Sequence, residues 1–288
     1  MELRVLKYFI AIAREGNMTR AAEILHVTQP TLSKQIKDLE IELGKKLFAR
    51  TNYAVRLTAE GEILYKRALD IVTLAADTVD ELKNMEAETG GNINIGAAES
   101  DSIRHIARLI RRLQSENRGI KVSIYSGDSE AVEYRLDRGQ LDFAVVVRDF
   151  NPAKYNAVEL PYKDRFGLIC RADNPLSQKS QITIEDLKDE PIIVSRQAFA
   201  HDLRKWCGEA ADSLNVVATG DIPFNLSLLV KEGLGSLVCF DKIINTGDGS
   251  DLRYIPFFPP LEAPMYIIWK KNADFTPAAR KFREMLEF

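Results

Sequence analysis

The sequence predicts a mixed α/β protein with an N-terminal winged helix-turn-helix, a long linking helix and a two-lobed α/β body. Three observations lead to this prediction. Residues 18–40 fit two short helices joined by a tight turn, and the second helix has a polar, basic face. Apolar residues then recur at spacings of three and four through residues 62–88, which contain no Gly or Pro. After Gly90-Gly91, strand and helix patterns alternate to the end of the chain, as in α/β folds.

The boundaries of the first three helices can be read from their end residues. We expect Gly16 to end the first helix and Asn17 to cap the second. The turn of the motif falls at His26-Val27. Thr28 is a good N-cap for the third helix, and Pro30 lies in its first turn, where the missing N–H costs nothing.

The third helix is predicted to carry the face that contacts DNA. Its buried stripe contains Leu32, Ile36 and Leu39, and the opposite face carries hydroxyl, amide and ammonium groups, which bind base edges and phosphates. A plain three-helix bundle with a solvated polar face is the alternative interpretation. The residues of the polar face are Gln29, Thr31, Ser33, Lys34 and Lys37.

The charge distribution favours DNA binding. Residues 1–58 contain ten Lys or Arg and six Asp or Glu, a balance of +4, whereas residues 59–88 sum to −5 and the remainder to −2. The whole chain has a formal net charge of −3, so its basic charge is concentrated in the N-terminal part. This asymmetry is typical of a nucleic-acid-binding head on a near-neutral body.

This part of the chain resembles the LysR-type transcriptional regulators. The resemblance extends more loosely to the C-terminal end and implies that the third helix reads the major groove, with Gln29, Pro30, Ser33 and Lys34 in contact with DNA. The motifs that carry it are Asn17-Met-Thr-Arg-Ala-Ala, Thr28-Gln-Pro-Thr-Leu-Ser-Lys-Gln-Ile-Lys-Asp-Leu-Glu, Leu43-Gly, Leu47-Phe and Leu57-Thr-Ala-Glu-Gly.

Residues 47–58 look like the hairpin wing of a winged helix. Arg50 and Arg56 would follow the phosphates of the DNA backbone, although ordinary solvated charge is the alternative for both. The family often has a second basic residue near position 53, where this chain has Tyr53.

The linking helix carries a heptad pattern that predicts pairing with a second copy. Thr58 can cap a helix that begins at Ala59. A narrow apolar stripe favours a coiled coil, and packing against the chain's own body is the alternative. The family resemblance also implies dimers formed by these helices, and often tetramers. The predicted contact residues are Leu64, Ala68, Ile71, Ala75, Leu82 and Met85.

The domain boundaries follow from these patterns. We predict a DNA-binding domain at 1–58, a dimerisation helix at 59–89 and a body at 90–288. The body would have one lobe at about 90–160 and 265–288 and another at about 161–264, both with mostly parallel sheets. The body resembles the periplasmic-binding-protein-like effector domain of the same family, through Gly127-x-Ser129, Leu141-Asp-Phe-Ala-Val and Val230-Lys-Glu-Gly-Leu-Gly.

A small-molecule effector is expected in the cleft between the two lobes. Ligands of open α/β sheets bind beyond the carboxyl ends of strands, near helix N-termini. For each serine found there, an N-cap role is the alternative. Acidic and basic residues are mixed around this position, and we slightly favour a small acid or zwitterion as the ligand. The candidate residues are Ser100, Ser102, Ser129, Arg148, Ser195, Arg196 and Gln197.

Other classes of function find no support in the sequence. The three cysteines, Cys170, Cys207 and Cys239, are widely spaced and suggest reduced thiols in a cytoplasmic protein. No histidine pair has metal-ligand spacing, and we find no catalytic motif, cofactor motif or membrane-spanning run. We therefore expect a transcription regulator, not an enzyme, that binds double-stranded DNA, a small effector and a second copy of itself. A solute-binding or enzymatic body with a helical head that does not bind DNA is the alternative.

Overall fold

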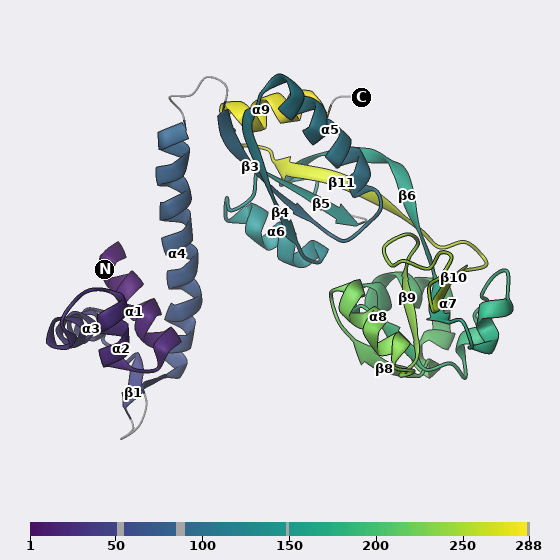
Figure 1. The fold of residues 1–288 in the computed structure, drawn as a ribbon, viewed down its shortest axis with the longest axis horizontal. Coiled ribbons are helices and arrows are strands. Elements are labelled where there is room, and N and C mark those ends of the chain that lie inside the picture. The colour runs from purple at the N-terminus through teal and green to yellow at the C-terminus, as the bar shows by residue number, and fades with distance from the viewer. Residues whose placement is uncertain (51–54, 85–89, 148–149, 287–288) are drawn as a thin grey trace. The chain divides into compact units, whose positions relative to one another are not determined.

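The computed structural model describes residues 1–50, 55–84, 90–147 and 150–286, which form two compact units, residues 1–86 and 87–288. We call the first unit the head and the second the body. Figure 1 shows the head at the purple end of the chain and the body from teal to yellow. Because each unit has its own hydrophobic core, each is described separately.

The head contains three short helices, a two-stranded wing and one long helix. The wing strands pair antiparallel, with Phe48 opposite Leu57, which agrees with the predicted hairpin. The elements are α1 (Leu3–Glu15), α2 (Met18–Ile24), α3 (Gln29–Leu43), β1 (Phe48–Arg50), β2 (Val55–Leu57) and α4 (Ala59–Asn84).

The predicted caps of the head are present. The Asn17 side chain accepts hydrogen bonds from the backbone N–H groups of Thr19 and Arg20 at the start of α2. Thr58 caps α4 by accepting from the Gly61 N–H at 3.0 Å, and it donates to the Lys46 carbonyl at 2.7 Å. These bonds satisfy backbone donors that the first helical turn leaves unpaired.

Helix α4 packs on the head through the first half of its length. Ala68 is fully buried, and Leu64, Tyr65 and Leu69 pack against the same core, which also contains Phe9 of α1. Ala68 is therefore not available to a second copy, and the prediction for this residue is wrong. Part of the apolar stripe covers the head's own core, whereas the alternative interpretation had the helix packing on the body.

The wing lies so close to α4 that a glycine is required between them. A Cβ atom on Gly61 would lie 2.2 Å from the Leu47 carbonyl oxygen, a distance that backbone atoms cannot tolerate. Gly61 is part of the Leu57-Thr-Ala-Glu-Gly motif. The glycine of this motif is thus explained by a close helix–strand approach.

The body contains two lobes joined by long crossing strands. In the first lobe, helices α5 and α9 lie on one side of the sheet and α6 on the other (Figure 1). In the second lobe, the order of the strands in the sheet is β6 (Tyr155–Arg171), β9 (Ser236–Phe240), β7 (Ile192–Val194) and β8 (Val216–Thr219). Strand β10 (Leu252–Pro256) also pairs with β6. The first-lobe elements are β3 (Gly90–Ala97), α5 (Ile103–Glu116), β4 (Gly119–Ser126), α6 (Ser129–Asp137), β5 (Phe143–Val147), β11 (Glu262–Lys270) and α9 (Pro277–Glu284).

The second lobe is built from shorter pieces. Residues 198–213 form three short helices in succession, a π-helix, Ala198–Leu203, then α7 (Arg204–Cys207) and a 3-10 helix, Gly208–Ser213. The 3-10 helices Pro175–Gln178 and Glu185–Leu187 precede it. The remaining elements are β7 (Ile192–Val194), β8 (Val216–Thr219), α8 (Pro223–Lys231), β9 (Ser236–Phe240) and β10 (Leu252–Pro256).

Strand β6 (Tyr155–Arg171) is the longest of the described strands. Its first half pairs antiparallel with β11, with Tyr155 opposite Lys270, and its second half pairs with β9 and β10. All antiparallel pairs described in the body involve β6 or β11, and the other strand pairs there are parallel. Among the described strands of the body, four pairs are parallel and four are antiparallel, so the expectation of mostly parallel sheets is wrong, because β6 and β11 run antiparallel to their neighbours in both lobes.

Candidate functional site

The head presents a polar surface on α3 that could contact DNA. Thr28 caps the helix by accepting from the Thr31 N–H, and Pro30 lies in the first turn. Leu32, Ile36 and Leu39 are buried, so the opposite face of the helix is turned outward. The predicted contact residues Gln29, Pro30, Thr31, Lys34 and Lys37 are all exposed, and Ser33 is half-buried.

The turn that precedes α3 adopts an unusual backbone conformation. His26 has a φ of 54°, in the left-handed region. The Val27 N–H donates to the Ala22 carbonyl at 3.0 Å, which closes the turn. This tight turn joins α2 to α3 in the predicted helix-turn-helix.

The predicted wing residues are only partly described. Arg56 is exposed on β2. Arg50 ends β1, but its side chain lies outside the described part of the structure, as does Tyr53. Of the two predicted wing residues, Arg56 is the one whose side chain the structure describes.

The exposed apolar side chains of α4 differ from the predicted set. Ile71 is 39% exposed, as predicted for a contact residue, and Ile63 and Leu74 are 65% and 45% exposed. These three residues are separated by 8 and 3 positions and share one face of the helix. Leu64 packs on the head and Ala75 is half-buried, while the Leu82 side chain and Met85 lie outside the described residues.

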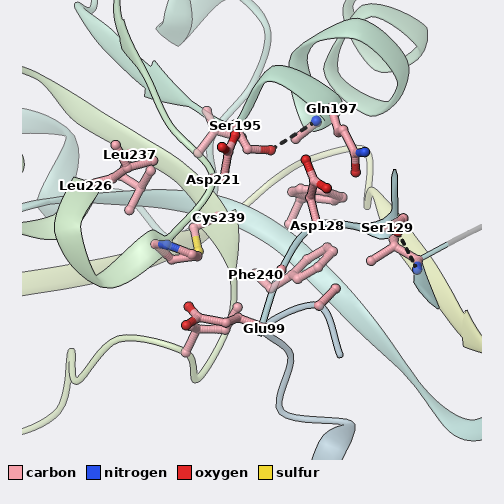
Figure 2. A pocket seen from close by; sticks show the side chains of 18 residues that line it. Glu99, Asp128, Ser129, Ser195, Gln197, Asp221, Leu226, Leu237, Cys239 and Phe240 are labelled. Carbon is pink, nitrogen blue, oxygen red and sulfur yellow. Dashed lines mark hydrogen bonds between the residues drawn. The ribbon is translucent and has the colours of Figure 1, made fainter. Parts of the chain in front are cut away.

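A cavity opens in the body where strand ends from both lobes meet. Ser129, Ser195 and Gln197, three of the predicted effector residues, line it. Figure 2 shows Asp128 and Ser129 of the first lobe on one side and Ser195, Gln197 and Asp221 of the second lobe on another. The carboxyl-end rule for α/β sheets therefore located this cavity correctly.

The serines that line the cavity also have structural roles. The Ser129 hydroxyl accepts from the Val147 N–H, and the Ser195 hydroxyl accepts from the Ala198 N–H, each at 3.1 Å. An N-cap-like role, the alternative interpretation for each serine, thus applies to Ser195. A hydroxyl that already accepts one bond can still donate its proton to a ligand.

Three of the predicted effector residues have other partners and do not line the cavity. Ser100 and Ser102 are buried, and both donate hydrogen bonds to the Asp164 carboxylate on β6, at 3.2 Å for Ser102. The exposed Arg196 side chain donates to both Asp221 oxygens, at 2.9 and 3.1 Å. These three side chains thus bond to carboxylates of the protein itself in this structure, and their contact with an effector stays a prediction. Arg148 lies outside the described residues.

The predicted effector residues did not include the acidic and aromatic lining of the cavity, although acidic residues were expected near it. Glu99, Asp128 and Asp221 line it, as do Phe166 and Phe240. The three carboxylates follow the ends of β3, β4 and β8, so the strand-end rule that selected the serines would also have selected them. The phenylalanines lie within strands, where no local pattern separates a cavity wall from a core position.

The cysteines and the charged residues add no further site among the described residues. Cys170, Cys207 and Cys239 are buried free thiols, and burial raises the pKa of Cys170 and Cys207 to about 11. The described residues hold no group of His, Cys, Asp and Glu side chains that could bind a metal ion. They also contain no helix long and apolar enough to cross a membrane.

Comparison with known proteins identifies both units of the chain. Residues 3–62 match the model of the bacterial regulatory helix-turn-helix protein, lysR family, and residues 86–287 match the LysR substrate binding domain. The chain is 31% identical to the HTH-type transcriptional regulator AlsR of Bacillus subtilis, over 82% of this chain and 79% of AlsR. It is 39% identical to BudR of Klebsiella aerogenes, over 49% of this chain and all of BudR.

Solved structures show the same fold. Full-length CbnR in complex with its target DNA aligns over 99% of both chains with a TM-score of 0.78 and 21% sequence identity. The family models together span nearly the whole sequence, which agrees with the resemblance found in its motifs. The chain therefore belongs to the LysR family of bacterial helix-turn-helix transcription regulators.

Proposed function

We propose that this regulator reads its operator with α3 in the major groove and with the β1–β2 wing against the phosphate backbone. The observation that carries this proposal is the exposed polar row Gln29, Thr31, Lys34 and Lys37, which lies within residues 1–58, a segment of net charge +4. The Gln29 amide can both donate to and accept from a base edge, and the ammonium groups of Lys34 and Lys37 pair with phosphates. The Thr31 hydroxyl already bonds to that of Thr28 at 2.8 Å, so Thr31 contributes less than Gln29.

We propose that two copies associate through the exposed apolar face of α4, formed by Ile63, Ile71 and Leu74. Leaving these side chains in water is unfavourable, and pairing two such helices removes them from it. A two-fold dimer would place two recognition helices on a two-fold-related operator. Leu74→Asp is expected to give monomers in light scattering of the purified full-length protein. Glu62→Gln, which alters an exposed polar residue of the same helix, should leave the mass unchanged.

The cavity of the body is the proposed effector site. It combines polar groups from both lobes with an apolar wall, as small-molecule sites do. A ligand held by both lobes would stabilise one arrangement of the lobes over others. Any resulting change in DNA affinity, footprint or bend must be matched by an equal effect of DNA on ligand affinity.

A DNA-binding regulator acts where the chromosome is, so we place this protein in the cytoplasm. The experiment that tests DNA recognition is selection of genomic fragments with the purified protein at moderate salt, read by sequencing. We expect enrichment of a two-fold-related site, and loss of that enrichment in the double variant Gln29→Ala/Lys34→Ala. If the protein binds all fragments equally and loses them uniformly as salt rises, sequence-specific reading by α3 is ruled out.

A further inference from the structure

The described side chains that line the body cavity carry negative charge and no positive charge. Glu99, Asp128 and Asp221 are acidic, and the described lining includes no Lys, Arg or His. Asp221 is neutralised by Arg196, whose guanidinium nitrogen lies 2.9 Å from a carboxylate oxygen. Among the described lining residues, the carboxylates of Glu99 and Asp128 therefore carry the charge that is not neutralised within the protein.

Neither of these carboxylates is fully used within the protein. Asp128 accepts from the Ala131 N–H through Oδ1 at 2.8 Å, and its second oxygen has no partner among the described residues. Its carboxylate points toward the side of the cavity that holds Ser195 and Gln197 (Figure 2). Glu99 is half-buried and has neither a hydrogen bond nor an ion pair with any described residue. Burial raises the pKa of Glu99, and no cation among the described residues offsets that rise.

Apart from Ser129, Ser195 and Gln197, most of the remaining wall is apolar. Phe166, Phe240, Leu237, Val238 and Ile243 line the cavity between the carboxylates. A ligand that fits this wall has a hydrocarbon or aromatic part, because burying a polar surface there without partners is costly. The ligand is therefore amphipathic, with its polar end directed to the carboxylates.

A metal ion does not account for the acidic lining. None of the described groups of His, Cys, Asp and Glu side chains is arranged so that it could hold a metal ion. The described lining therefore favours an organic cation over a metal ion as the partner of Glu99 and Asp128.

We propose that the effector is a small organic amine whose ammonium group pairs with Glu99 or Asp128 and whose apolar part packs on Phe166 and Phe240. This inference rests on the proposed function, in which the cavity is the effector site. An ammonium group relieves the cost of an unpaired, half-buried carboxylate, whereas a ligand carboxylate would add like charge beside it. The slight preference for a small acid in the sequence analysis is thereby replaced, and a zwitterion stays compatible through its amino group.

The test compares amines with acids of the same length on the full-length protein. The probes are n-butylamine and 1,4-diaminobutane, with butyrate and succinate as their carboxylate counterparts, at constant ionic strength. We expect the amines to raise the unfolding temperature and to bind in titration calorimetry, because a ligand that binds only the folded state stabilises it. The acids are expected to do neither.

Three variants locate the binding site. Glu99→Gln and Asp128→Asn keep the size of each side chain, and the amide oxygen that Asp128→Asn introduces can still cap α6. We expect at least one of them to raise the Kd of the amine about tenfold or more. Glu209→Gln removes the same charge from an exposed position outside the cavity lining and should leave the Kd unchanged.

The outcomes also separate this inference from the proposed function. If the acids bind as well as the amines, or if Glu209→Gln weakens amine binding as much as the cavity variants, the proposed ligand class is wrong. If an acid binds and changes the DNA footprint, effector control stands and only the amine is excluded. If none of the probes binds, the amine inference is overturned, while the operator selection still decides DNA recognition on its own.

Discussion

The head and the body of this regulator build their functional surfaces in different ways. The proposed DNA-contacting residues of α3 come from a single stretch, residues 29–37, which one helix turns outward. The cavity lining comes from separate segments between Ala98 and Ile243, carried by strand ends of both lobes. A motif of consecutive residues can therefore identify the first surface, whereas the second exists only after the sheets have assembled.

The two units also differ in how they treat a buried carboxylate. Burial alone would raise the pKa of Glu40 in the head, but hydrogen bonds from Lys46 and from the N–H groups of Leu47 and Phe48 outweigh it and lower the pKa. In the body, burial raises the pKa of Asp164, and the hydrogen bonds from Ser100 and Ser102 only partly oppose the rise. The head thus stabilises the charged form of Glu40, whereas burial in the body disfavours the charged form of Asp164.

The largest effect is expected from the packing of the wing on α4. In Gly61→Val, the new Cβ would clash with the Leu47 carbonyl, so the strand or the helix must move. We expect the head to lose about 3 kcal/mol of stability, at the upper end of overpacking effects, and specific DNA binding to fall with it. Both tryptophans, Trp206 and Trp269, lie in the body, so their fluorescence transition should be unchanged while the helical circular dichroism signal shows early loss of the head. A single shifted transition for both signals would contradict the separation of the two units.

The next largest effect concerns base reading by α3. Gln29→Ala should weaken binding to the selected operator by about 10- to 100-fold and bring it closer to binding of unrelated DNA. Lys37→Ala should instead weaken all duplexes similarly and reduce the salt dependence by about one unit. Equal losses on operator and unrelated DNA for Gln29→Ala would mean that its amide contacts the backbone. Binding is measured by fluorescence anisotropy over a salt series.

A smaller effect is the opposite response of the two units to acid. As the pH falls through about 4.3, the ordinary glutamate pKa, Glu40 becomes protonated in the unfolded head before it does so in the folded head. The head therefore loses stability until the pH reaches the lowered pKa that Glu40 has in the folded state. The effect of Asp164 on stability has the opposite sign, because Asp164 becomes protonated in the folded body before it does so in the unfolded chain. Its buried charge destabilises the folded body at neutral pH, and this destabilisation disappears as the pH falls through the raised folded-state pKa of Asp164.

Two variants check these signs. Glu40→Gln should reduce the loss of stability that the head shows at acid pH. Asp164→Asn should remove the gain of stability that the body shows at acid pH. The size of each effect reports how far the folded-state pKa departs from its ordinary value, at about 1.4 kcal/mol for each pKa unit. Denaturant unfolding at several pH values, followed by circular dichroism and by tryptophan fluorescence, measures the two units separately. If Asp164→Asn instead steepens the pH dependence of the body, the raised pKa is wrong.

The smallest effect is expected for the ion pair at the rim of the cavity. Arg196 and Asp221 have 71% and 41% of their side chains exposed, so their attraction is weakened by water. Arg196→Gln should change the stability of the body by less than about 1 kcal/mol in denaturant unfolding. A loss of several kcal/mol would show that this pair holds the second lobe together and is more than a surface contact.

The sequence by itself determined the head and the order of elements in the body. Asn17, Thr28 and Thr58 cap their helices as predicted, because a cap bonds to backbone groups only two or three residues away. The wing and the exposed face of α3 follow equally from local spacing. Strand β10 and the first half of β6 were missed, because β10 shows no strong local pattern and β6 gains its length from pairing with the distant β11.

Only the tertiary structure decided which way the remaining side chains face. Ser100 follows a strand end, as predicted, yet its hydroxyl bonds to Asp164, 64 positions later in the chain. Ala68 fits a heptad pattern, yet the head's own core covers it. Local hydrogen-bonding and periodicity fix where helices and strands begin and end, whereas the partner of a side chain depends on which distant segments pack beside it.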